Sequence, residues 1–175
     1  MANYDTKQIR NIALAGHGGC GKTSLTEAML FASGGTDRLG KISDGNTVCD
    51  FDQEEKTRGF SLSSSVAHVF WKDIKINIID TPGYLDFEGE VNQAIRVADS
   101  VWICVDGKAG LDVGTELAWD KAQSAGIPKA FFINKCDDPD AHFGGTFTKL
   151  HEKFGTSLCP VFIPVGKSGK DIIMI

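Results

Sequence analysis

The segment that most constrains the fold is a glycine-rich stretch near the N-terminus, residues 16–23, which reads GHGGCGKT. It fits the pattern GxxxxGK[ST]. A short apolar run at residues 9–15 precedes it, and apolar residues at helical spacing follow it over residues 22–33. In a strand–loop–helix context, the loop N–H groups surround phosphate oxygens, and the helix adds the positive end of its dipole. The sequence therefore predicts a phosphate-binding loop, called the P-loop below.

The P-loop supplies the first set of candidate ligand-binding residues. They are Gly16, His17, Gly18, Gly19, Cys20, Gly21, Lys22 and Thr23. The ammonium group of Lys22 is expected to reach the β- and γ-phosphates of a nucleotide, and the hydroxyl of Thr23 to bind Mg²⁺. The alternative is a glycine-rich turn with no ligand, which the flanking strand and helix disfavour.

A second motif, DTPG, consists of residues 80–83 and begins at the end of the expected strand 74–80, which has isoleucine at positions 74, 76, 78 and 79. The carboxylate of Asp80 is expected to hold the Mg²⁺ through water. The N–H of Gly83 is expected to sense the γ-phosphate, because a residue without Cβ allows close backbone approach. DTPG alone is a common turn, and its place one strand after the P-loop favours the functional interpretation.

A third motif, NKCD, ends the apolar run 128–134 and carries Asn134, Lys135 and Asp137. Guanine presents two adjacent donors, N1–H and the N2 amino group, which one carboxylate at Asp137 can accept. Adenine would place an acceptor against that carboxylate, and such a mismatch supports large discrimination. Lys135 is expected to pack its stem over the base and to brace the P-loop. The motif indicates GTP or GDP as the ligand and disfavours the alternative of a P-loop ATPase or kinase.

Apolar runs alternate with helical patterns along the chain, which predicts an α/β fold of the P-loop NTPase (GTPase) type. We expect a mostly parallel sheet with one antiparallel edge hairpin and flanking helices. The expected strands are 9–15, 61–71, 74–80, 100–106 and 128–134; the expected helices are 22–33, 87–98, 112–125 and 143–154. The polar stretch 34–59 is interpreted as a long functional or mobile loop. Its acidic run, residues 50–55, fits a solvated loop or a first switch equally well.

Longer segments resemble translational GTPases, and elongation factor G in particular. Residues 80–87, DTPGYLDF, are similar to the family's DTPGHVDF, and residues 50–62, DFDQEEKTRGFSL, resemble the segment that ends in ERGITI. Residues 134–155 and 161–166 resemble its NKMDR and PIQLPIG regions. The resemblance spans nearly the whole chain and favours the divergent elongation-factor-G-like branch. It implies GTP binding, Mg²⁺-dependent GTP hydrolysis and, through the full-length protein, the ribosome as partner.

The resemblance also assigns site residues, with three departures from the family pattern. Ser61 stands where the family has its Mg²⁺-binding threonine, so the implied metal set is Thr23, Ser61 and Asp80. Gly19 replaces an aspartate, which argues against an extra cation site in the P-loop. Tyr84 replaces the histidine that positions the attacking water. The implied catalytic set is Lys22, Gly83 and Tyr84, and the alternative is a GTP-binding switch module with little hydrolysis.

Composition limits the location and partners of the chain. The net charge of −5 argues against direct nucleic-acid binding by this segment. Five cysteines without a CxxC pair indicate reduced thiols. No apolar run approaches the roughly 18 residues of a membrane span, so a cytoplasmic protein that does not contact membranes is expected.

The resemblance further implies that residues 1–175 are a GTP-binding domain that is incomplete at its C-terminal end. The family's guanine-loop motif of the SA type is not found in the sequence. The last stretch, residues 160–175, is apolar and strand-like with a KSGK turn, and is expected to begin an inserted subdomain. We therefore expect this piece of a longer protein to bind nucleotide weakly.

Overall fold

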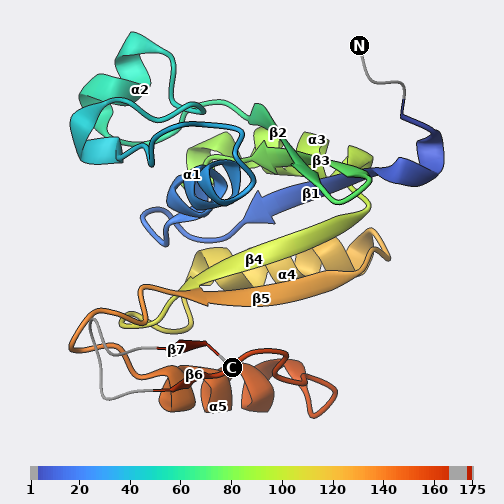
Figure 1. Ribbon diagram of the computed structural model, residues 1–175. Coiled ribbons are helices and arrows are strands. Elements are labelled where there is room, and N and C mark those ends of the chain that lie inside the picture. Colours follow the sequence, from blue (N-terminus) through green and yellow to red (C-terminus); the bar gives the residue numbers. More distant parts are fainter. Residues whose placement is uncertain (1–3, 166–172, 175) are drawn as a thin grey trace.

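The computed structural model describes residues 4–165 and 173–174 and is built around a five-stranded sheet (Figure 1). The order across the sheet is β2-β3-β1-β4-β5. The strands are β1 (Ile9–Ala15), β2 (Ser65–Trp71), β3 (Ile74–Asp80), β4 (Ser100–Asp106) and β5 (Lys129–Asn134). β1 pairs in parallel with β3 and β4, β4 pairs in parallel with β5, and β2 runs antiparallel to β3. The predicted parallel sheet with one antiparallel edge hairpin is confirmed.

Helices cover both faces of the sheet. They are α1 (Lys22–Ala32), α3 (Glu88–Val97), α4 (Val113–Ser124) and α5 (Phe143–Phe154). In Figure 1, α1 lies on the near side of the sheet, while α3 and α4 lie behind it. Each begins and ends within one or two residues of its predicted range. The start of α3 is preceded by a 3-10 turn, η3 (Leu85–Phe87), and another 3-10 turn, η1 (Thr6–Gln8), precedes β1.

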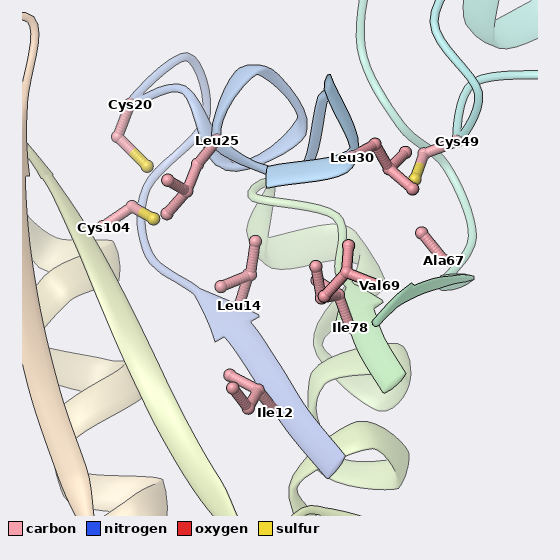
Figure 2. Close-up of a cluster of buried hydrophobic side chains, with 10 residues drawn as sticks. All are labelled: Ile12, Leu14, Cys20, Leu25, Leu30, Cys49, Ala67, Val69, Ile78 and Cys104. Carbon is pink, nitrogen blue, oxygen red and sulfur yellow. The ribbon is translucent and has the colours of Figure 1, made fainter. Parts of the chain in front are cut away.

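Two hydrophobic cores form because successive side chains of β1 point to opposite faces of the sheet. Leu14 packs on the α1 side with Leu25 and Leu30 of that helix (Figure 2). On the other side, small residues of β1 pack against the alanines of α3 and α4. The second half of β1, residues 12–15, is buried on both faces and is a continuous apolar run, as is typical of a central strand.

A prediction about stability concerns Ile103, a fully buried residue of β4 in the core behind the sheet. Replacing it with valine removes one methylene and leaves a small cavity, so we expect a loss of about 1 kcal/mol in unfolding free energy. Urea denaturation followed by circular dichroism measures the loss. Val66→Ala, at an exposed position of β2, is the control and should change stability far less. Equal losses at the two positions would contradict this assignment of the core.

The stretch 34–59 contains more structure than sequence pattern predicted. It includes a 3-10 turn, η2 (Ile42–Asp44), and a helix, α2 (Gln53–Arg58). Asp52 caps α2 in a capping box with Glu55, and Gly59 ends it in a left-handed conformation. The side chain that α2 buries is the carboxylate of Glu55, so the helix has no row of apolar residues. Hydrophobic pattern therefore could not reveal it.

The strand expected at residues 61–71 begins only at Ser65. The backbone N–H groups of Leu62 and Ser63 donate to the Glu55 carboxylate at 2.9 and 3.3 Å. The last residues of the loop are therefore hydrogen-bonded to a side chain of their own loop, outside the sheet ladder.

The C-terminal stretch 160–175 contributes a separate antiparallel pair, β6 (Pro164–Val165) and β7 (Ile173–Met174). The predicted KSGK turn lies outside the described residues. That this stretch begins an inserted subdomain stays a prediction. Within residues 4–165 and 173–174, no helix has the length and apolar character needed to cross a bilayer.

Candidate functional site

The P-loop joins the end of β1 to the start of α1. The ammonium of Lys22 is buried there and donates to the carbonyl oxygens of Gly16 and His17 at 3.0 and 2.9 Å. Gly16 has a φ of +133°, and a Cβ at this position would overlap the carbonyl oxygen of Cys104. The loop backbone is thus folded around the lysine, and glycine is needed where the loop passes β4.

The three predicted metal residues come together beside the P-loop. Asp80, at the end of β3, is fully buried, and neither of its carboxylate oxygens has a hydrogen-bond partner within the described part of the chain. Burial raises the pKa of Asp80 to about 7, against the nearby Thr23 and Lys22, which lower it. The hydroxyls of Thr23 and Ser61 lie 3.4 Å apart. Two hydroxyls and one unsatisfied carboxylate therefore face the same small region.

Gly83 places its backbone directly against the P-loop. A Cβ built on this residue would lie 2.5 Å from Nζ of Lys22 and 2.7 Å from the backbone nitrogen of Gly18. Such distances leave no space for any side chain. The backbone of Gly83 therefore lies against the P-loop, and the expectation that its N–H senses the γ-phosphate stays a prediction.

Tyr84, the next residue, lies over the P-loop. Its ring is tilted at 53° to that of Phe60, with ring centroids 4.5 Å apart. A Cβ added to Gly18 would lie 3.2 Å from Cζ of Tyr84, so the ring covers this glycine at contact distance. The side chain stays 46% exposed. Phe60 and Tyr84 thus connect the loop before β2 to the loop after β3 by an aromatic contact.

These segments enclose a cavity of about 240 Å³. Its lining comprises P-loop residues, the loop before β2, the DTPG segment and the NKCD motif: Gly18, Gly19, Gly21, Lys22, Thr23, Ser24, Ile42, Gly59, Phe60, Ser61, Thr81, Gly83, Tyr84 and Lys135. All three motifs therefore contribute to one cavity at the carboxyl edge of the sheet, where ligands of parallel α/β proteins bind.

The NKCD motif at the end of β5 braces the P-loop, as predicted. The amide of Asn134 donates to the carbonyl oxygen of Cys20 at 3.0 Å, and Nζ of Lys135 donates to that of Gly19 at 2.6 Å. Lys135 also pairs with Asp106 at 2.7 Å. Burial opposes ionisation of Asp106, but hydrogen bonds from Lys135 and two backbone N–H groups lower its pKa overall. Asp137 is exposed beyond this contact, with its carboxylate open to solvent.

Comparison with known proteins identifies the family. The family described as elongation factor Tu GTP binding domain matches residues 7–173. The chain belongs to this family. It is similar to the mitochondrial ribosome-releasing factor 2 of Anopheles gambiae, with 40% identity over 94% of the chain, and to elongation factor G of Chlamydia caviae, with 36% identity over 98%. The resemblance predicted from sequence is confirmed.

A solved structure agrees with this assignment to the elongation factor Tu GTP-binding family. A crystal structure of a protein from Thermus thermophilus superposes with a TM-score of 0.90 and 34% identity over 96% of the chain. The chain spans about a quarter of the length of these proteins: 22% of the ribosome-releasing factor, 25% of the elongation factor and 25% of the solved structure.

Sequence pattern missed several buried carboxylates of this family member that organise the loop before β2. Glu27 in α1 accepts two backbone N–H groups of that loop. Asp50 accepts the Ser61 hydroxyl at 2.7 Å, and Glu55 accepts the N–H groups described above. The acidic run 50–55 is therefore not simply a solvated loop, since Asp50 and Glu55 are buried within it. No motif and no periodicity marks Glu27 in the sequence, and the family resemblance over residues 50–62 includes Asp50 and Glu55 without assigning them a role.

Proposed function

We propose that this chain binds GTP and GDP and hydrolyses GTP with Mg²⁺, as a domain of an elongation-factor-G-like translation factor. The observation that carries the proposal is the buried Asp80 carboxylate, which has no hydrogen-bond partner within the described residues and lies near Thr23 beside the P-loop cavity. Such a group is costly to bury without compensation, and a cation bound with a nucleotide would compensate it. The proposed ribosome partnership and cytoplasmic location rest on resemblance and composition.

The residues present fit Mg²⁺ better than a cation held by protein alone. Within the described residues, no group of three histidine, cysteine, aspartate or glutamate side chains could hold a metal ion. Mg²⁺ characteristically uses one or two carboxylates and completes its shell with waters and substrate phosphates. Thr23, Ser61 and Asp80 would hold it. The ion, when bound, neutralises charge that develops on the β- and γ-phosphate oxygens.

The protein's own residues supply positioning and charge. Lys22 would exchange its two P-loop carbonyl partners for phosphate oxygens, and the N–H of Gly83 would donate to the γ-phosphate. The P-loop N–H groups would hold the remaining phosphate oxygens. Asn134 and Lys135 keep the P-loop in place through Cys20 and Gly19, so that base recognition at Asp137 and phosphate binding share one rigid support.

A second candidate function is a GTP-binding switch with little hydrolysis, which the position of Tyr84 favours. Its ring lies between Phe60 and Gly18, and it lacks the imidazole that the resemblance implies at this position. Single-turnover phosphate release distinguishes the two functions. A rate no faster than that of free GTP in buffer, with tight binding retained, would support the switch.

Nucleotide titrations with GTP, GDP and ATP test the proposal, and Ser61 sharpens the test. Ser61→Ala removes one proposed metal ligand, so we expect about a ten-fold higher Mg²⁺ concentration for half-maximal GTP binding. Ser63→Ala is the matched control, because Ser63 is an exposed serine of the same loop. Mg²⁺ titrations of GTP binding measure the shift. Equal Mg²⁺ requirements in both variants would remove Ser61 from the metal set, and tighter binding of ATP than GTP would overturn the proposal.

A further inference from the structure

Glu27 is a buried acidic side chain in the middle of α1 that no part of the proposed mechanism uses. It is 1% exposed and forms no ion pair within the described part of the chain. Its two carboxylate oxygens accept backbone N–H groups instead, from Gly40 at 3.1 Å and from Val48 at 2.6 Å. Burying an unpaired carboxylate is costly, so this arrangement requires both hydrogen bonds to be good ones.

The two N–H groups delimit a short, self-contained segment, residues 40–48. The N–H of Lys41 donates to the side-chain oxygen of Asn46 at 2.7 Å, which closes the segment on itself. An added Cβ at Gly40 would overlap the Glu27 carboxylate, so a side chain here would displace that carboxylate or the loop. The segment is therefore a compact unit that is attached at both ends to one side chain of α1.

This segment contributes Ile42 to the lining of the nucleotide cavity, together with the P-loop. Glu27 lies one helical turn beyond Thr23, on the helix that begins at the P-loop. Helix α1 thus carries the proposed phosphate-binding residues at its start. One turn later it carries Glu27, which binds the segment 40–48 that lines the cavity. Movement of residues 40–48 away from α1 would withdraw Ile42 and open the cavity.

We propose that Glu27 is a positioning residue that holds residues 40–48 against α1 and thereby limits the rate at which bound nucleotide leaves. The inference rests on the proposed nucleotide binding, and it adds a determinant of retention that touches neither nucleotide nor metal. Entry and release both pass through the open form of the segment, so loss of the anchor should speed release and should not slow association.

The first test compares wild type with Glu27→Gln, which keeps the side-chain shape but removes the charge and turns one acceptor into a donor. Stopped-flow displacement of a fluorescent GDP analogue should show release about ten-fold faster or more, with association no slower than in wild type. Trypsin should cut after Lys41 faster in the nucleotide-free variant, because the exposed Lys41 lies in the released segment. Glu54→Gln is the matched control, since Glu54 is an exposed carboxylate that pairs with Arg58 of its own helix.

A purely structural role predicts a different result: lower thermal stability and a smaller fraction of protein that binds nucleotide, with wild-type release from the fraction that does bind. The variant Gly40→Ala approaches the same contact from the loop side and decides the matter if Glu27→Gln folds poorly. Because both changes break one contact, the double variant should release nucleotide no faster than the worse single variant.

Unchanged release and unchanged cleavage after Lys41 in both variants, with binding intact, would overturn the inference. Additive effects in the double variant would overturn it as well. Failure of the wild-type chain to bind any guanine nucleotide would overturn the proposed function instead. The trypsin comparison on nucleotide-free protein would still show whether Glu27 anchors the segment.

Discussion

Asp137→Asn is expected to weaken GTP binding on the order of 10³-fold and to relax selectivity toward xanthine nucleotides. The carboxylate can accept both the N1–H and the N2 amino group of guanine, whereas an amide offers one acceptor and one donor. Xanthine carries a carbonyl at C2, which can accept from the new amide. Asp137 is exposed, so the effect should fall on the base and leave the fold intact. Binding of GTP and XTP to both proteins, by competition with a fluorescent analogue, measures the change.

The control for this prediction is Asp140→Asn, three residues further along the chain. Asp140 is also an exposed carboxylate, and it pairs with Lys108, which is not a residue of the NKCD motif. This variant should bind GTP like the wild type. If Asp137→Asn and wild type bind GTP equally well, Asp137 does not read the base, and the interpretation of the NKCD motif is wrong.

Tyr84→His is expected to raise the ribosome-stimulated rate of GTP hydrolysis by the full-length protein about ten-fold or more. Phosphoryl transfer needs a positioned water and stabilised charge. Lys22, the P-loop N–H groups and the metal residues would supply the charge, and all are in place. The resemblance to elongation factor G implies a histidine at this position to orient the water, and proton-transfer groups of this kind contribute about 10²–10⁴-fold. Only part of that gain is expected, because a smaller ring loses contact with Phe60.

Tyr84→Phe is the matched variant, because it keeps the ring over Gly18 and removes only the hydroxyl. It should change the rate little, since the ring makes the contacts of Tyr84 with Phe60 and Gly18. Single-turnover rates of the three forms, with and without ribosomes, decide the question. If Tyr84→Phe abolishes turnover while Tyr84→His does not raise the rate, the tyrosine hydroxyl itself positions the water. The presence of tyrosine in place of histidine then does not slow hydrolysis.

The strands and the helices that flank them could be predicted from sequence because their signals are local. β1 and β4 are apolar runs bounded by glycines and polar turns, and α5 was located at its observed limits, Phe143–Phe154. Helix α2 could not be predicted in this way. It is six residues long, and it is stabilised by a capping box and one buried carboxylate, with no apolar stripe for periodicity to detect.

By itself, the sequence determined which motifs this chain carries: a P-loop, a DTPG turn and an NKCD motif, in an order that an α/β sheet brings to one edge. Tertiary structure alone decided how the loop before β2 is held. Glu27 carries no motif, and Asp50 and Glu55 lie in the acidic run 50–55, which in sequence fits a solvated loop and a first switch equally well. Only the folded chain shows that backbone N–H groups and hydroxyls distant in sequence satisfy them. A hydrogen bond between residues 13 or 21 positions apart, such as those of Glu27 to Gly40 and Val48, leaves no periodic signal in the sequence, because its partner is chosen by the path of the loop.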